Sequence, residues 1–505
     1  MRALSKSRIM AFRQCPRRLW LEVHRPELKQ EEARTHASYQ AGHAVGELAR
    51  SLFDPLGRGC LIDAERLGFP AVFQATQQAL SARRPIFEAA FTTGDALALA
   101  DILLPVGSDS WRMVEVKSST AVKSVHREDL ALQVHVARLA GLHLQGASIA
   151  RIDKTWIHPG EARYDGLLVE EDFSSEVLGR GEDAQGWIDG AQRVAAEAQP
   201  PQISTGAQCT DPYPCGFRAW CDEQEPPVEM PIEWLPHLKA GRWRQQGIRD
   251  MREIPAESLR PRQRRVRDCT VDQAVFFDQE GARRELARHP LPGYFLDFES
   301  VQFAVPIWAG TRPYQQIPFQ FSLRFVTPEV DVGPSSLLDG RAGMDGTDFL
   351  DLSGGDPSRR LAESLIESCG EAGPVFVYNA GFERSCIREL GERFPDLRGA
   401  LGAIDARIVD LLPIARKRYY APSQRGSWSI KDVLPAAVPG LSYEQLEGVR
   451  GGGGAQEAFL EAIAPQTTAE RREALRRQLL DYCRLDTYAM VKLWEVFSGH
   501  VEWRL

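Results

Sequence analysis

The sequence has no long hydrophobic run and no excess of positive charge. No apolar stretch approaches the roughly 18 residues that a membrane-spanning helix needs, so we expect no membrane partner. The N-terminus, Met1 to Lys6, carries no apolar segment of the kind found in a signal peptide. The net charge of −8 argues against a protein that coats nucleic acid through bulk positive charge. A nuclease is still compatible, because acidic metal ligands and local basic patches can occur in one chain.

Length and composition predict a globular protein of several domains. With 505 residues, the chain has enough material for about three domains with separate cores. The hydrophobic content of 43% and the charged content of 26% are ordinary for a globular protein. We expect a cytoplasmic location, where the nine cysteines are better explained as free thiols or metal ligands than as disulfides.

The segment Trp111–Ser119 predicts a core strand that carries charge. Its apolar and β-branched residues predict a strand, and side-chain alternation directs Glu115 and Lys117 to one face. Residues 96–104 predict a second strand, and a hairpin between the two would bring Asp101 close to this pair. Two carboxylates can hold a divalent cation, and a neighbouring lysine can orient an attacking water. The alternative is an edge hairpin with a surface ion pair.

Helices are expected on both sides of this hairpin in the sequence. Ser5 is a suitable N-cap for a helix that ends near Cys15. A second helix is expected over Ala33–Phe53 and carries His43, although a lone histidine on a helix is more often structural than a ligand. A third helix, after the hairpin, carries Gln133. The order of helices, antiparallel strands and helix predicts an α/β nuclease core.

Three cysteines, Cys209, Cys215 and Cys221, recur at equal spacing in a loop rich in proline, glycine and aromatic residues. Soft thiolates select zinc or an iron–sulfur cluster, and Cys15, which also precedes a proline, is the obvious fourth ligand. Zinc ribbons usually contain close Cys-x-x-Cys pairs. The pattern therefore favours an iron–sulfur cluster of the [4Fe-4S] type, with zinc or three ordinary buried thiols as alternatives.

Residues 1–222 resemble the iron–sulfur members of the RecB-like PD-(D/E)xK exonuclease superfamily. The matching residues are Cys15, His43, Asp101, Glu115, Val116, Lys117, Gln133, Cys209, Cys215 and Cys221. The metal ligands that the resemblance implies, for Mg²⁺ or Mn²⁺, are His43, Asp101, Glu115 and the Val116 carbonyl. It also implies that Lys117 is catalytic and that Gln133 helps to place the substrate. Ala137 departs from the pattern, because such enzymes often have tyrosine there.

Residues 223–288 are expected to connect two domains. Within them, Glu233–Arg252 predicts a helix, and Leu259–Arg267 concentrates arginines. A run of like charge is usually a solvated face. Because this run lies between two candidate nuclease domains, contact with phosphates is an equal alternative.

A second set of acids lies in the C-terminal part of the chain. Asp297 and Glu299 alternate with apolar residues, so both face one side of a predicted strand. Glu383 follows another predicted strand, near the start of a helix. Tyr482 and Asp486 are four residues apart and share one face of a late helix. Acids on these elements suit a two-metal site, which clamps the attacking and leaving oxygens of a phosphodiester.

This set resembles the DEDD exonucleases, which have a ribonuclease H-like fold, in the variant with tyrosine before the last acid. The roles it implies are metal binding for Asp297, Glu299 and Asp486, completion of the metal shell for Glu383, and orientation of the attacking water for Tyr482. Glu383 replaces the aspartate usual in that family, and Asp410 is a reserve candidate. Residues Gly426–Leu434 resemble the stretch before the late helices, and Gly451–Gly454 predicts a short flexible loop.

The whole chain resembles bacterial fusions of a RecB-like nuclease with a DEDD domain whose C-terminal part is catalogued as a domain of unknown function. We therefore expect a PD-(D/E)xK domain over 1–222, a helical basic connector over 223–288 and a ribonuclease H-like domain over 289–505. The resemblance implies a metal-dependent exonuclease that prefers DNA to RNA and acts on single strands or free ends. The alternatives are a nucleic-acid-binding scaffold with one or both sites inactive, and an RNA-processing exonuclease.

Overall fold

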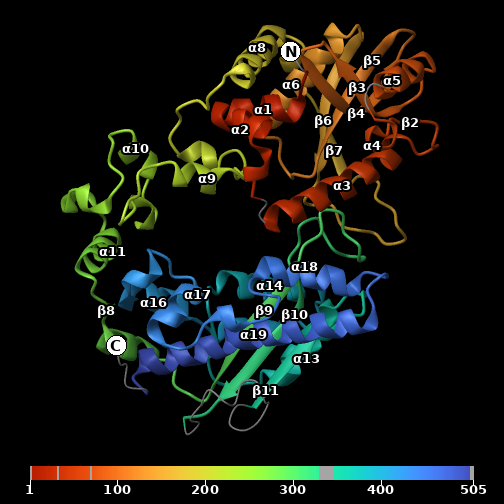
Figure 1. Cartoon of the computed structure of the whole chain (residues 1–505). Helices are drawn as coiled ribbons and strands as arrows, with labels where there is room; N and C mark the ends of the chain where they lie inside the picture. The colour runs from red at the N-terminus through yellow and green to blue at the C-terminus, as the bar shows by residue number, and fades with distance from the viewer. Residues whose placement is uncertain (1–2, 31–32, 69–70, 329–344, 501–505) are drawn as a thin grey trace. The chain divides into compact units, whose positions relative to one another are not determined.

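The computed structural model describes residues 3–30, 33–68, 71–328 and 345–500. The chain forms two compact units (Figure 1). Unit 1 comprises Met1–Pro227 and Phe303–Tyr314, and unit 2 comprises Val228–Gln302 and Gln315–Leu505. Most of the expected connector thus belongs to unit 2, and a segment from the C-terminal half belongs to unit 1. Both units combine helices with mixed sheets, which confirms the α/β fold class.

A mixed sheet forms the centre of unit 1, in the order β2-β3-β4-β5-β6-β7, and β1 pairs with β4. Its strands are β1 (Leu4–Ser5), β2 (Cys60–Leu61), β3 (Ile86–Thr92), β4 (Ala96–Val106), β5 (Ser110–Lys117), β6 (Leu144–Ile152) and β7 (Leu168–Asp172). Strands β4 and β5 are antiparallel, with Leu103 opposite Met113, whereas β5 and β6 are parallel. The predicted hairpin between the strands that carry Asp101 and Glu115 is confirmed.

Helices cover both faces of this sheet (Figure 1). They are α1 (Lys6–Gln14), α2 (Pro16–His24), α3 (Ala33–Phe53), α4 (Ala64–Leu67), α5 (Ala71–Ser81), α6 (Ser124–Leu139), α7 (Ser174–Val177), α8 (Gly181–Ala196) and α9 (Arg218–Glu223). On one face, Met113 of β5 shares a core with α1, α6 and α8. The next residue, Val114, shares a second core with α3, because neighbouring side chains on a strand point to opposite faces.

The local predictions for helices are partly confirmed. Ser5 is the N-cap of α1, since its hydroxyl accepts from the Arg8 amide at 3.4 Å, and α3 has the predicted bounds. The helix predicted over Glu233–Arg252 is wrong, because this range contains only short turns and the helix α10 (Ala240–Arg244). Pro236 lacks a backbone donor, and Gly247 adopts a φ of +79°, outside the helical region.

Unit 2 contains a second mixed sheet, in the order β11-β10-β9-β12-β13. Its strands are β9 (Gly293–Val301), β10 (Ile317–Val326), β11 (Asp345–Leu350), β12 (Val375–Val377) and β13 (Ile408–Asp410). The central strand β9 is antiparallel to β10 and parallel to β12. A separate two-stranded sheet joins β8 (Phe276–Phe277) to β14 (Tyr419–Tyr420).

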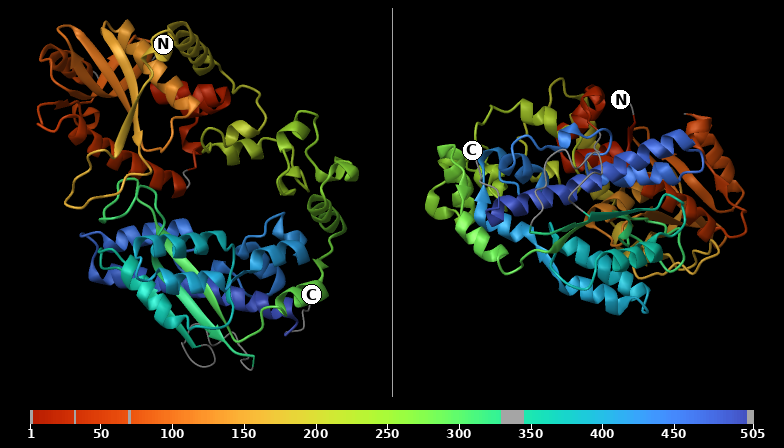
Figure 2. Two further views of the ribbon diagram at one scale, coloured as in Figure 1. Left: turned by 180° about the vertical axis from the view of Figure 1, so that it is seen from behind. Right: turned by 90° about the horizontal axis from the view of Figure 1, so that it is seen from below.

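Helices pack on both faces of the five-stranded sheet, as Figures 1 and 2 show. They include α13 (Ser358–Ser368), α14 (Gly381–Arg393), α15 (Arg398–Ala406), α18 (Gly452–Ile463) and α19 (Ala469–Ser498), with α11 (Pro261–Asp272), α12 (Gln279–Leu286), α16 (Leu411–Arg418) and α17 (Ile430–Ala437) beside them. Leu296 and Phe298 of β9 share a core with α13, α14 and α15. Asp297 and Glu299 alternate with them and therefore face α19. None of the helices within the described ranges is long and apolar enough to cross a membrane.

The flexible loop predicted at Gly451–Gly454 is wrong, because Gly451 is the N-cap and the other three glycines begin α18. Glycine lowers helix propensity, but packing decides here. Ala455 and Ala458 of α18 are buried, and the Phe459 ring stacks on Phe319 of β10, with 4.1 Å between ring centroids. The apolar face of the helix thus stabilises a segment that its glycines disfavour.

Candidate metal centres

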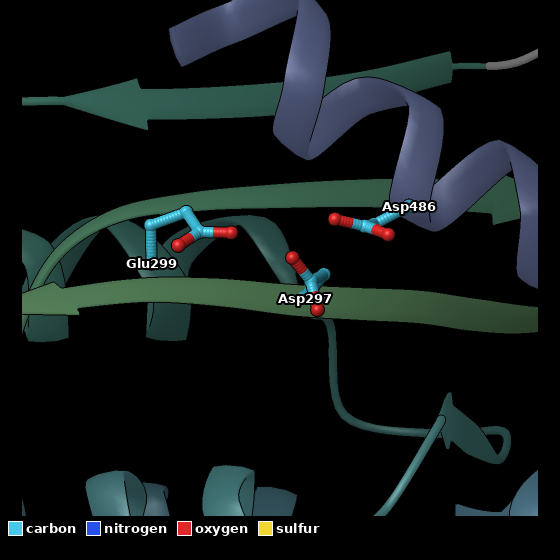
Figure 3. A group of neighbouring side chains, drawn as sticks. All are labelled: Asp297, Glu299 and Asp486. Atoms are coloured by element: carbon cyan, nitrogen blue, oxygen red, sulfur yellow. The ribbon is translucent and has the colours of Figure 1, made fainter. Parts of the chain in front are cut away.

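Three carboxylates of unit 2 form a compact group. One oxygen each of Asp297, Glu299 and Asp486 lies within 4.8 Å of the other two (Figure 3). Asp297 and Glu299 come from β9, and Asp486 comes from α19 above that face of the sheet. Within the described ranges, no other group of three or more possible metal-ligating residues has this spacing. The structure therefore brings together three acids that the sequence predicted.

The negative charge of this group is offset only in part, because among the described residues Lys431 lowers the pKa of Glu299 and of Asp486 against the larger effect of burial. Glu299 and Asp486 are each 7% exposed, and in the described part of the chain none of the three acids forms a salt bridge. Burial, followed by repulsion from Asp486, raises the pKa of Asp297 and of Glu299 well above the usual range. Burial raises the pKa of Asp486 to about 6. Buried carboxylates are costly without a cation, and their oxygens are the ligands that Mg²⁺ and Mn²⁺ prefer.

Three residues that the sequence interpretation missed also approach the acids. The Tyr443 hydroxyl donates a hydrogen bond to Oδ1 of Asp486. The Cys483 thiol lies 3.5 Å from Oδ2 of Asp297. Lys431 Nζ lies 5.0 Å from the ring centroid of Tyr482 and 5.3 Å from that of Tyr443. Cys483 could have been found from its position three residues before Asp486, and Lys431 from its segment, whereas no local signal marks Tyr443.

Glu383 and Tyr482 lie beside the group rather than in it. Glu383, in the first turn of α14, is 2% exposed, and burial raises its pKa to about 8. Its Oε2 is buried without a hydrogen-bond partner in the described part of the chain. Tyr482 is 5% exposed, and burial followed by the charge of Asp486 raises its pKa far above the usual range.

The reserve candidate Asp410 has a structural role. Its Oδ1 accepts from the amides of Asn379 and Leu412, both at 2.9 Å, and its Oδ2 accepts from the Ala380 amide at 3.1 Å. Asp410 thereby caps α16 and fixes the turn after β12. Its carboxylate is already satisfied by backbone donors.

In unit 1, Glu115 is the centre of a dense ionic network. Lys117 Nζ lies 2.5 Å from Oε1 of Glu115 and 2.6 Å from Oδ2 of Asp129. Lys6 Nζ lies 3.2 Å from the same Glu115 oxygen. Gln133 is fully buried and donates to Oε2 of Glu115 at 2.6 Å. In this geometry Gln133 positions the Glu115 carboxylate. The resemblance, by contrast, implied that Gln133 helps to place the substrate.

The network explains the charge states of its lysines. Burial alone would lower the pKa of Lys117, but Asp129 and Glu115 raise it well above the usual range. Burial also opposes the shift at Lys6, but Asp129 and Glu115 again raise the pKa of this lysine. Burial, followed by the charge of Glu115, raises the pKa of Asp101. Oδ2 of Asp101 accepts from the Val116 amide at 2.7 Å, which ties the two predicted motifs together.

Three charged residues of this site were missed from sequence. Lys6 is the first residue of α1, and Asp129 lies on α6 one turn before Gln133. Glu88 lies on β3 with a φ of +59°, which is unusual for a non-glycine residue, between Phe87, paired with Ile102, and Ala89, paired with Ala100, in an unshifted register. Burial, followed by the charge of Glu115, raises the pKa of Glu88. Lys6, Asp129 and Glu88 come from three separate elements, so their convergence has no local sequence signal.

A cavity of about 760 Å³ opens over this network. Its lining includes Asp101, Glu115, Val116 and Lys117, together with His43 of α3. His43 is exposed, and the described residues contain no compact ligand group that includes it. The structure therefore places His43 in the same cavity as the predicted acids, at a wider spacing than the acids of unit 2.

The four predicted cysteines line one small cavity of unit 1: Cys15, Cys209, Cys215 and Cys221. All four are free thiols. Burial raises the pKa of Cys215, and raises that of Cys221 to about 11. No three of the sulfurs form a group within 4.8 Å among the described residues. A tetrahedral zinc site, with Zn–S bonds of about 2.3 Å, would need sulfurs about 3.8 Å apart.

Comparison with known proteins leaves this chemistry unassigned. Residues 294–429 match a family model described as Domain of unknown function (DUF2779). The matched region includes Asp297, Glu299 and Glu383 and ends before Asp486. A search of curated proteins finds no match.

Proposed function

We propose that the protein is a metal-dependent nuclease that hydrolyses phosphodiester bonds. The observation that carries this proposal is the compact group of Asp297, Glu299 and Asp486, none of which forms a salt bridge within the described part of the chain. The charge of Lys431 offsets only part of their negative charge. A cation would balance this charge, and the all-carboxylate ligand set suits a hard divalent cation, for which we propose Mg²⁺ or Mn²⁺. Metal ions bound there supply Lewis acidity and a nucleophilic water.

The residues around the acids support a phosphoryl reaction. Asp297, Glu299 and Asp486 hold the cations, and Glu383 adds a fourth carboxyl at the edge of the group. Tyr482 orients the attacking water through its hydroxyl. Lys431, whose ammonium lies over the Tyr482 ring, offers a positive charge to a substrate phosphate. The central strand β9 and its mixed neighbours support the resemblance to ribonuclease H-like exonucleases.

Unit 1 supports a second hydrolytic site of the PD-(D/E)xK type. Asp101 and Glu115 come from the two strands of one hairpin, and Lys117 contacts Glu115 directly. His43 and the Val116 carbonyl complete the proposed ligand set. Because DNA is the substrate of the enzymes that unit 1 resembles, we favour DNA over RNA, and single strands or free ends over intact duplex. We also propose a cytoplasmic location.

The cavity lined by Cys15, Cys209, Cys215 and Cys221, here called the cysteine cavity, favours a bound cluster that links the early and late segments of unit 1. Cys15 lies at the end of α1, and the other three cysteines lie about 200 residues later. Their wide spacing fits an iron–sulfur cluster, proposed as [4Fe-4S], better than a single zinc ion. This group would hold α1 and the late loop together.

The test pairs metal binding with cleavage in the full chain. Asp297→Asn is compared with Asp405→Asn, which removes the same charge from an acid that pairs with Arg384 instead. We expect Asp297→Asn to lose Mn²⁺ bound in unit 2, measured by electron paramagnetic resonance, and to lose cleavage of an end-labelled oligonucleotide by that site. Asp405→Asn should keep both. Unchanged Mn²⁺ binding in Asp297→Asn would contradict the proposal, and metal binding without any cleavage would favour the scaffold alternative.

A further inference from the structure

The wall of the unit 1 cavity contains two exposed aromatic rings. Tyr39 of α3 is 70% exposed, and Tyr213 of the cysteine loop is 45% exposed. Both line the cavity that contains Glu115 and Lys117. A single exposed aromatic residue is normal on a protein surface. Two exposed rings in the wall of one cavity, beside an ionic network, suggest a binding role.

Tyr213 is held in place although it is exposed. Its hydroxyl lies 3.2 Å from Nε2 of the buried His126, and its carbonyl accepts from the Gln14 side chain at 2.7 Å. The Lys123 ammonium lies 5.8 Å from the ring centroid. Cys209 and Cys215, which lie on either side of Tyr213 in the sequence, line the cysteine cavity. These contacts fix the Tyr213 ring in the cavity wall, so less conformational entropy is lost when a ligand binds to it.

The cavity also offers positive charge for a phosphate backbone. Lys29, Arg18 and Arg50 line it, in addition to the two lysines of the ionic network. Tyr39 contacts the predicted ligand His43 edge to face, with 5.1 Å between ring centroids. Exposed rings combined with nearby cations are the usual means of binding unpaired bases, because every base has a π face that can stack. A paired duplex keeps its bases stacked on one another and cannot offer them.

We propose that Tyr213 and Tyr39 form a stacking site for the unpaired bases of a single-stranded nucleic acid that enters the unit 1 cavity. This proposal rests on the proposed nuclease function and specifies its substrate as an unpaired strand. It also gives the cysteine loop a second role, since the loop that carries the thiols supplies one of the two stacking rings. Loss of the cluster would therefore weaken substrate binding as well as stability.

The test measures binding without cleavage, using the full chain in Ca²⁺ with no Mg²⁺ or Mn²⁺. Fluorescence anisotropy compares a labelled oligo(dT) strand with a blunt hairpin duplex. Tyr213→Ala and Tyr39→Ala should each weaken single-strand binding roughly tenfold or more and change duplex binding little. Tyr213→Phe keeps the ring and should keep the affinity. Leu139→Ala, which removes an exposed apolar side chain elsewhere in unit 1, should have no effect.

Cross-linking separates this site from any binding by unit 2. An oligonucleotide substituted with 5-iododeoxyuridine should, on irradiation, attach to the peptides that contain Tyr213 or Tyr39. Unchanged affinity of the folded Tyr213→Ala and Tyr39→Ala variants, or cross-links confined to unit 2, would overturn the proposal. Reduced binding in these variants, combined with no cleavage by the wild type, would support the stacking site and refute only the nuclease function.

Discussion

The Tyr443 hydroxyl donates a hydrogen bond to Asp486, although the two residues are 43 positions apart in the chain. This bond lowers the pKa of Asp486, whereas burial, the larger effect, raises it to about 6. Tyr443 thus favours the ionised carboxylate that a metal ligand requires. The relationship links the segment after α17 to the acids of β9 and α19.

Tyr443→Phe should therefore move metal binding to higher pH. Without the hydrogen bond, the pKa of Asp486 rises further, so protons compete with the cation over a wider acidic range. We expect the pH of half-maximal Mn²⁺ binding to increase by about one unit. Tyr420→Phe is the matched control, because its hydroxyl contacts Thr270 instead. A midpoint that does not move, or moves to lower pH, would show that Tyr443 does not tune the site.

Glu383 should make the metal-free protein less stable as pH rises. Its pKa is about 8 in the folded protein, against 4.5 in an unfolded chain. Between these values the folded state binds the extra proton, so its stability falls with increasing pH. Glu383→Gln cannot ionise, and we expect its melting temperature to change less than that of the wild type between pH 5 and pH 8. Equal slopes in the two proteins would contradict the buried position of Glu383.

Lys6 should stabilise unit 1 through Asp129 and Glu115. Removing one partner of a buried ionic network leaves charge unpaired, so Lys6→Ala should lower the free energy of unfolding by about 3 kcal/mol. Lys154→Ala, which removes an exposed lysine of the same unit, should change it by less than about 0.5 kcal/mol. The measurement is urea unfolding followed by circular dichroism. If Lys6→Ala matches the exposed control, the contacts do not contribute to stability.

The cysteine cavity should hold iron rather than zinc after anaerobic purification. We expect bound iron and sulfide, with a visible absorption band that Cys215→Ala loses. Cys60→Ala should keep both, because Cys60 lies on β2 and does not line the cavity. Metal analysis that finds one zinc per chain and no iron would contradict the cluster assignment.

Local patterns predicted the strands and helices that carry the main acids. The alternation around Asp297 and Glu299 and the hairpin of Asp101 and Glu115 follow from short-range periodicity, which a sequence displays directly. The helix start at Gly452 was missed, because tertiary packing overrides glycine propensity there.

The supporting residues of both sites could not be predicted in this way. Lys6 and Tyr443 reach their sites from elements distant in sequence, and a single sequence contains no signal for such long-range convergence. The left-handed φ of Glu88 is likewise not signalled by its residue type, because glycine is the residue that usually adopts it. The main acids and Lys117 were therefore predictable, whereas Lys6, Glu88 and Tyr443, which shift the pKa of neighbouring acids, were not.

The most direct test of the two-site nuclease is a cleavage assay on end-labelled single-stranded DNA with Mn²⁺ and anaerobically purified protein. Wild type, Lys117→Ala, Asp297→Ala and the double variant are compared in one experiment. We predict partial loss of cleavage in each single variant and complete loss in the double variant. Loss in only one single variant would assign hydrolysis to one unit and leave the other as a binding module. Undiminished cleavage by the double variant would contradict both assigned sites.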